Sequence, residues 1–266
     1  MPYLSKLFVS TLLAALMLTG CSGLDKDPTA DWSAKDFYDE ARRDLDDGEF
    51  QSAIKNLETL EARFPFDKYA KQAQLDVAYS YFKFDEPDAA ISAADRFVRL
   101  HPRDPNIDYV YYLKGLINFK RGSGLLDSWF PRDMAKHETD TLNNAFNDFA
   151  TLVRRYPDSR YAGDAYQRMI YLQNELAQHE IDVAEYYLSR KAWLGAANRA
   201  KTVIERYENS VWRNRALEIM HTAYTEMGLD ELAADTRRII ELNPAPRKPA
   251  PGEFDPALEK PPSTRS

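Results

Sequence analysis

The stretch AYSYFKFDEPDAAISAADRFVRLHP, residues 78–102, carries the pattern that decides the fold. Its first residue, Ala78, is followed by Ala90 and Pro102 at spacings of 12 and 12. The same spacing recurs along the chain in Ala41, Ala53 and Pro65, in Ala145 and Pro157, and in Ala184 and Ala196, with Glu208 in place of a proline. Small residues let two successive helices pack closely, and proline ends the second helix. The spacing therefore predicts repeated pairs of helices.

This pattern resembles the tetratricopeptide repeat (TPR), whose period is about 34 residues. The first unit has Gly48-Glu49-Phe50 at its turn, as the TPR family does. A second alanine pattern supports the repeat: Ala73, Ala165 and Ala216 each follow eight residues after the residue that ends a unit, at the start of the next helix. The resemblance implies an all-α fold, an α-solenoid of about five repeats. Repeats 1–3 occupy residues 33–158 and repeats 4–5 occupy residues 159–242. The alternative is an irregular helical bundle in which the alanines coincide by chance.

The third unit departs from the repeat. Gly115 takes the first small position, but Ala145 follows 30 residues later rather than 12. About 18 residues, 121–138, are therefore inserted, and we expect a loop that displays Leu125, Leu126, Trp129 and Phe130. Loops of this length without their own secondary structure are usually functional. Further on, residues 160–190 contain no helix breaker except Gly163, which predicts one long helix joining the third and fourth units.

The N-terminal residues 1–20 are typical of a signal peptide. One cation, Lys6, precedes an apolar run of about 13 residues, which is shorter than the roughly 20 that span a bilayer as a helix. The run ends in Leu18-Thr19-Gly20-Cys21, which resembles the lipobox of bacterial lipoproteins, and Cys21 is the only cysteine of the chain. The resemblance implies that Cys21 is lipidated and that Ser22 directs transfer to the outer membrane. The alternative is an N-terminal anchor helix with a chance cysteine.

Two further segments flank the helical region. Residues 21–32 read as a polar tether. Residues 243–266 hold seven of the 15 prolines and no apolar periodicity, which predicts a disordered, proline-rich tail. The formal net charge of −7 argues against a nucleic-acid partner, since such partners require a basic surface.

The chain carries no motif for catalysis, a cofactor or a metal. The four histidines are scattered, and neither a phosphate loop nor a nucleophile motif is present. A single cysteine excludes a zinc site built from cysteines. Gly122-Ser123-Gly124 lacks the strand and helix context of a phosphate loop, and the carboxylates are best explained as solvated helix faces. We therefore expect a scaffold that is not an enzyme and binds neither cofactor nor metal.

The TPR resemblance implies a curved stack with the first helix of each pair on its concave face. Family geometry places aromatic and cationic residues of the first three units there. The predicted peptide-binding groove consists of Tyr38, Tyr79, Phe82, Lys83, Tyr109, Tyr112, Phe119 and Lys120. Rings supply large contact areas, and a lysine can pair with a carboxylate. The alternative is that some of these rings pack between helices.

The fourth unit lacks aromatic residues at the equivalent positions and presents cations instead. Trp193, predicted to be exposed, and Arg199 lie six residues apart on or beside its second helix. Tryptophan and arginine are the residue types enriched at the centres of protein interfaces. We therefore predict that Trp193 and Arg199 dock a partner protein. The alternative is that Arg199 is only a solvated surface cation.

Residues 62–116, 145–169 and 183–207 resemble the BamD family, TPR lipoproteins of the outer-membrane β-barrel assembly (BAM) machine. The resemblance covers about residues 18–242, including the lipobox and the insertion. It implies a protein on the periplasmic face of the outer membrane, whose C-terminal repeats dock the last POTRA domain of BamA. It also implies that the N-terminal repeats recognise unfolded outer-membrane proteins and that accessory lipoproteins such as BamC bind there. The alternative is a different TPR lipoprotein, linked to cell-wall synthesis or division.

Overall fold

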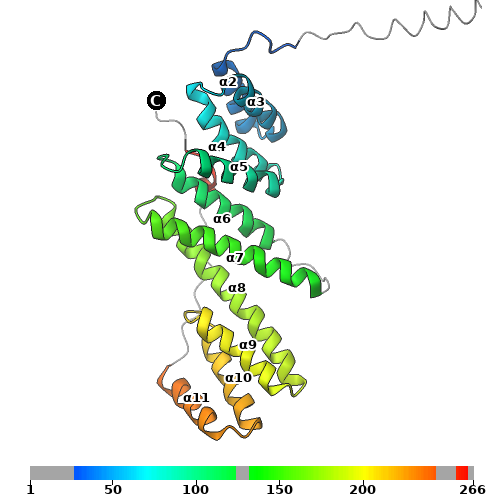
Figure 1. Ribbon diagram of the computed structural model, residues 1–266, viewed down its shortest axis with the longest axis vertical. Helices are drawn as coiled ribbons and strands as arrows, with labels where there is room; N and C mark the ends of the chain where they lie inside the picture. Colours follow the sequence, from blue (N-terminus) through cyan, green and yellow to red (C-terminus); the bar gives the residue numbers. More distant parts are fainter. Residues whose placement is uncertain (1–26, 124–131, 244–255, 263–266) are drawn as a thin grey trace, which may run out of the picture.

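The structure is a computed structural model that describes residues 27–123, 132–243 and 256–262 (Figure 1). The predicted signal peptide, Cys21 and residues 21–26 of the tether lie outside the described residues. Within the described ranges the chain forms helices and no strand. The helices are α2 (Ala34–Asp47), α3 (Phe50–Arg63), α4 (Lys68–Lys83), α5 (Pro87–Leu100), α6 (Ile107–Ser123), α7 (Arg132–Arg155), α8 (Ala162–Ser189), α9 (Trp193–Arg206), α10 (Arg213–Glu226), α11 (Asp230–Leu242) and the 3-10 helix η1 (Pro256–Glu259).

The α-helices form an elongated stack of pairs, each helix packing against its neighbours in the chain (Figure 1). The alanines at the 12-residue spacing make this packing possible. Ala41, Ala53, Ala78, Ala90, Ala145, Ala184 and Ala196 are all 0% exposed. The predicted all-α helical solenoid is confirmed, and the helix expected over residues 160–190 is present as α8.

The turns between pairs share one hydrogen-bonding pattern. After α3, α5, α7 and α9, a polar side chain accepts a hydrogen bond from the backbone N–H two residues later, which prepares the start of the next helix. The accepting residues are Asp67, Asp104, Ser159 and Ser210. This pattern is independent of the prolines, so the turn after α9 forms with Glu208 in the proline position. There the Tyr207 N–H donates to the Val203 carbonyl and the Ser210 N–H donates to the Tyr207 carbonyl.

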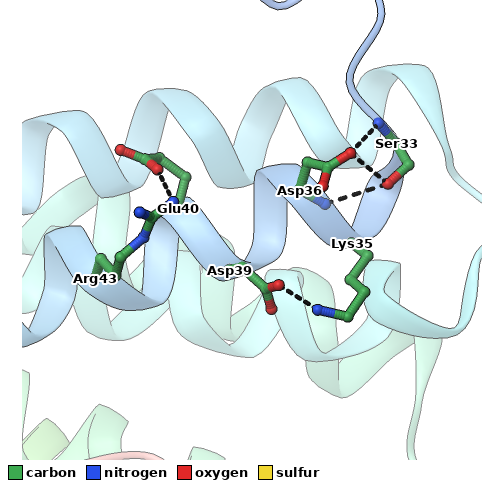
Figure 2. A network of polar contacts seen from close by, with 6 residues as sticks. All are labelled: Ser33, Lys35, Asp36, Asp39, Glu40 and Arg43. Carbon is green, nitrogen blue, oxygen red and sulfur yellow. Dashed lines mark hydrogen bonds and ion pairs between the residues drawn. The ribbon is translucent and has the colours of Figure 1, made fainter.

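The first helix of the stack begins with a capping box (Figure 2). The Ser33 Oγ accepts a hydrogen bond from the Asp36 N–H at 3.3 Å, and the Asp36 carboxylate accepts one from the Ser33 N–H at 2.9 Å. Two backbone donors that a helix start leaves without partners are thereby satisfied. Gly48, with φ 80°, then closes α2 in the left-handed conformation that glycine adopts without strain.

The insertion 121–138 is helical at both ends, which corrects the expectation of a loop throughout. Residues 121–123 extend α6, and residues 132–138 form the beginning of α7. The side chains expected on display, Leu125, Leu126, Trp129 and Phe130, lie outside the described residues. A 24-residue α7 follows because residues 132–155 contain neither glycine nor proline.

Part of the tail also differs from expectation. Residues 243–266 were expected to be disordered throughout, but Pro256–Glu259 form η1, and Leu258 packs against the core of the N-terminal helices. The proline content predicts disorder, but it does not reveal the tertiary contacts that hold this segment. Figure 1 shows η1, in red, beside α4 to α6 rather than beside α11.

Two hydrophobic cores run through the stack, and α8 contributes to both. Leu172 and Leu176 belong to the core shared with α2 to α7, whereas Ile181 and Ala184 belong to the core shared with α9 and α10. The long helix therefore joins the two halves of the chain through packed side chains. Among the described helices, none combines the length and apolar character needed to cross a membrane.

Gly115 lies where α6 packs tightly against α7. A Cβ built at this position would lie 2.4 Å from the Phe149 ring, whereas one at Gly163 of α8 would meet nothing within 4 Å. Gly115→Ala should therefore lower the free energy of unfolding by about 1–2 kcal/mol, because overpacking outweighs the gain in helix propensity. The control Gly163→Ala should raise it by up to about 1 kcal/mol. Urea unfolding of both variants measures the difference, and equal stabilities would contradict the close approach.

Candidate peptide-binding groove

Four of the eight predicted groove residues line one cavity of about 320 Å³. Phe82 and Lys83 come from the end of α4, and Phe119 and Lys120 come from the end of α6. The remaining wall consists of Leu116 of α6, Arg168 of α8 and Glu259 of η1. The spacing along α4 and α6 places these residues together, because both helices reach the same edge of the stack.

The cavity combines aromatic faces with cations. The Lys120 Nζ lies 5.7 Å from the centre of the Phe82 ring and forms a 2.8 Å ion pair with Asp85. The Arg168 guanidinium lies 5.1 Å from the centre of the Phe119 ring. Cations over ring faces are attracted by the quadrupole of the ring. The site thus offers apolar area and positive charge within one cavity, which suits a peptide that carries both an aromatic side chain and a carboxylate.

The other predicted rings lie inside the fold. Tyr109 and Tyr112 are 0% exposed, and Tyr38 and Tyr79 are also buried. Tyr112 stacks on Tyr161 with ring centroids 5.0 Å apart, and Tyr109 lies 5.5 Å from the same ring. These tyrosines therefore pack between helices, which is the alternative that the sequence left open. A continuous open row of rings is not present.

Polar groups lie beneath the segment 256–262. The Gln72 Nε2 donates a hydrogen bond to the Asp76 Oδ1 at 2.8 Å, and both residues are buried in α4. Burial raises the pKa of the Asp76 carboxyl to about 6, although the Gln72 hydrogen bond and the Arg42 charge oppose the rise. Burial also raises the pKa of Tyr79 to about 12, with Glu259 a secondary cause. Burial raises the pKa of Tyr109 as well, so both hydroxyls are protonated at neutral pH.

Sequence reasoning missed one buried ion pair at this site. The Arg168 Nε lies 2.6 Å from the Asp164 Oδ2, and both side chains are under 10% exposed. The Tyr112 hydroxyl donates to the same Asp164 oxygen at 2.7 Å, so α6 and α8 share this carboxylate. The spacing of four residues between Asp164 and Arg168 on a long helix was the available signal. It gives no indication that the pair is buried.

The predicted docking residues lie on α9, away from this cavity. Trp193 is half-buried at the first turn rather than exposed, and Arg199 is exposed. The Arg199 Nη1 forms a 3.1 Å ion pair with Glu180 of α8, whose side chain is mostly buried. Six residues on a helix correspond to a rotation of about 240° beyond one full turn, so the two residues occupy different faces. The structure therefore does not bring Trp193 and Arg199 together.

Exposed apolar side chains near this region come from other positions. Tyr186 of α8 and Leu194 of α9 are 44% and 64% exposed. Tyr186 also lines a cavity of about 500 Å³ with His179, Asp182, Val183 and Tyr187. The sequence analysis did not identify Tyr186 and Leu194, because it compared only the positions that line the concave face in TPR proteins. In the described ranges, no group of three or more His, Cys, Asp or Glu residues is arranged to hold a metal ion.

A helical-repeat solenoid with a cavity at one edge is the architecture typical of protein-binding scaffolds. Residues 30–239 match the YfiO family, described as an outer membrane lipoprotein. The crystal structure of MamA aligns over 78% of this chain and 89% of its own length, with a TM-score of 0.38 and 17% identity.

Proteins named outer membrane protein assembly factor BamD are similar over most of the chain. The protein from Neisseria meningitidis serogroup A is 41% identical over 90% of this chain and 91% of its own. The one from Neisseria gonorrhoeae is 42% identical over 87% and 86%, and the one from Vibrio cholerae is 36% identical over 89% and 98%. This chain therefore belongs to the outer-membrane lipoprotein family that contains the BamD assembly factors.

Proposed function

We propose that this chain is a periplasmic-facing lipoprotein scaffold that binds BamA and helps unfolded outer-membrane proteins to fold and insert. In this proposal the lipid on Cys21 holds the chain at the outer membrane. The groove between α4, α6 and α8 binds segments of unfolded outer-membrane proteins, and α8 to α10 dock a POTRA domain of BamA. Accessory lipoproteins such as BamC bind along the N-terminal half.

The observation that carries the proposal is the cavity that groups Phe82, Phe119, Lys83 and Lys120. An aromatic side chain gains contact area there, and a lysine pairs with a carboxylate. A peptide strand that ends in an aromatic residue supplies both groups from a single residue. The names of the relatives favour this function over a role in cell-wall synthesis or division.

The second core supports a separate docking surface for BamA. Ala196, Ala200, Ala216 and Ile219 pack with α8 residues in a cluster of their own. A partner bound to α9, α10 and the C-terminal half of α8 therefore leaves the groove accessible, since the groove uses Arg168 in the N-terminal half of α8. Truncation after residue 158 is a poor test, since it also removes Leu172 and Leu176 from the N-terminal core. Point variants on α9 are the sharper probe.

Arg199→Glu should weaken the binding of an isolated POTRA domain of BamA by about 1–2 kcal/mol, or roughly 5- to 30-fold. The arginine is 45% exposed and already pairs with Glu180, so its contribution is smaller than that of a fully buried charge. The reversed charge also faces Glu180 and repels it. Calorimetric titration of the folded variant measures the loss.

Lys201→Glu is the matched control. It makes the same change in charge on the same helix, two residues away, where Lys201 pairs only locally with Glu205. We expect less than threefold weakening for this variant, because two residues on a helix are about 200° apart and Lys201 therefore faces away from the surface that carries Arg199. Equal effects of the two variants would remove Arg199 from the docking surface, and full affinity in both would place docking elsewhere.

A further inference from the structure

The chain's own C-terminal segment lies along the groove and forms part of its wall. The Tyr109 hydroxyl donates a 2.7 Å hydrogen bond to the Glu259 carbonyl oxygen, across 150 positions of sequence. The Gln72 Nε2 donates to the Pro262 carbonyl oxygen at 3.4 Å. Leu258 packs on the N-terminal core, and the Glu259 carboxylate lies 3.6 Å from the Lys83 Nζ. Figure 1 shows this segment against the α4 to α6 part of the stack.

These contacts are of three kinds that together recognise a peptide. Side-chain donors bind backbone carbonyls, an apolar side chain enters the core surface, and a cation faces a carboxylate. The segment also lines two cavities. Glu259 lines the cavity with Phe119 and Lys120, whereas Lys260 and Pro261 line a smaller one with Arg42 and Tyr79. A peptide that runs from one of these cavities to the other must therefore use the space that residues 256–262 occupy.

We infer that residues 256–262 are an intramolecular ligand of the groove that competes with the peptides of unfolded outer-membrane proteins. The inference rests on the proposed function of the groove and adds its regulation. It also states the ligand class: a short peptide with an apolar residue next to a carboxylate, whose main-chain carbonyls accept hydrogen bonds from Tyr109 and Gln72.

The buried donors explain why the groove favours an occupant with carbonyl acceptors. The Tyr109 ring is 0% exposed and Gln72 is 5% exposed. A buried donor without an acceptor is costly, so release of the segment requires a replacement acceptor from water or from an incoming peptide. An extended peptide supplies carbonyl oxygens at every residue. The incoming peptide can therefore take over the hydrogen bonds that the segment leaves.

The contacts are also weak enough to be exchanged. The Gln72 hydrogen bond and the Lys83 ion pair are both long, and Leu258 and Glu259 remain partly exposed. Attachment to the same chain offsets this weakness, because a tethered segment has an effective concentration on the order of 1 mM. A segment with a dissociation constant of about 0.1 mM in trans would then weaken the binding of a competing peptide about tenfold.

Docking of the segment is tested first, without any outer-membrane protein. A fluorescent peptide with the sequence of residues 253–266 is titrated against the chain ending at Asp255, and anisotropy is measured. We expect a dissociation constant of about 0.1 mM. Tyr109→Phe should weaken it about three- to tenfold, because the donor to the Glu259 carbonyl is lost while the ring remains.

Tyr161→Phe is the control, since the structure gives the buried Tyr161 hydroxyl no hydrogen-bond partner in the described residues. This variant should bind the tail peptide as the unsubstituted chain does. Binding that is absent at several millimolar, or equally weakened by both variants, would overturn the docking of residues 256–262.

Competition is then tested with a labelled peptide that ends in phenylalanine with a free carboxylate. It should bind the chain ending at Asp255 about tenfold more tightly than the chain ending at Ser266. The full-length variant Glu259→Lys, which places two cations together, should show a similar gain. Glu241→Lys on α11, where Glu241 pairs with Arg237, is the charge-matched control and should show none.

The outcomes separate the two claims. Equal affinity of the aromatic peptide for both chain lengths would overturn the competition while leaving the groove itself intact. If the aromatic peptide bound neither the chain ending at Asp255 nor the chain ending at Ser266, both the proposed function of the groove and the competition would be wrong. The first titration would still report whether residues 256–262 dock.

Discussion

Replacing Arg168 with methionine is expected to lower the free energy of unfolding by about 3–5 kcal/mol. The Arg168 and Asp164 side chains are only 5% and 7% exposed, and their charged atoms are 2.6 Å apart. Removal of the arginine leaves the Asp164 carboxylate buried with the Tyr112 hydroxyl as a remaining donor. A buried charge that loses its counter-ion is among the most destabilising single changes in a protein.

The same substitution should disturb the groove. The guanidinium lies over the Phe119 ring, and Phe119 in turn contacts Phe149 and Tyr171 with centroids 6.5 and 5.6 Å away. Methionine keeps much of the apolar stem but supplies no charge above the ring. We therefore expect weaker binding of the aromatic peptide even at temperatures where the variant is fully folded.

Urea unfolding followed by circular dichroism measures the stability, and two further variants interpret it. Arg160→Met removes a guanidinium 5.0 Å from the Tyr161 ring at an exposed position, and should change stability by less than about 0.5 kcal/mol. The double variant Asp164→Asn/Arg168→Met should recover part of the loss, because no charge remains buried. A loss below about 1 kcal/mol in the single variant would show that the pair is not desolvated in solution.

The fold was predictable because a single physical requirement repeats along the chain. Two helices that cross closely need small residues at the crossing, so Ala78 and Ala90 reveal the repeat through spacing alone. The turns were harder to predict, because the prolines drew attention away from the polar side chains that cap the next helix. The structure shows that Asp67, Asp104, Ser159 and Ser210 repeat the capping contact even where the proline is missing.

The groove was only partly predictable, for a geometric reason. The first helix of each TPR pair faces both the concave surface and the next pair, so position does not separate exposed rings from packed ones. Phe82 and Phe119 lie near helix ends and line the cavity, whereas Tyr109 and Tyr112 lie where α6 meets the turn before α8. The segment 256–262 was missed because one leucine among prolines gives no periodic signal.

The largest expected effect is on anchoring. We predict that Cys21→Ala removes the protein from the outer membrane and abolishes the incorporation of labelled palmitate. The apolar run before Cys21 has about 13 residues, too few to span the bilayer as a helix, so the prediction assigns the attachment to lipid on Cys21. Each buried CH₂ contributes about 0.8 kcal/mol, and two or more acyl chains are needed for stable anchoring. The variant should accumulate as soluble periplasmic or uncleaved protein.

The variant Ser22→Asp tests sorting between the two membranes independently of lipidation. The lipoprotein sorting rule implies that an aspartate after the cysteine retains the protein in the inner membrane, so this variant should label with palmitate but leave the outer-membrane fraction. Ser22→Ala should label and fractionate as the unsubstituted protein does. The measurement is palmitate labelling combined with density-gradient separation of the two membranes. A Cys21→Ala protein that still labelled and still fractionated with the outer membrane would show that Cys21 does not carry the anchor.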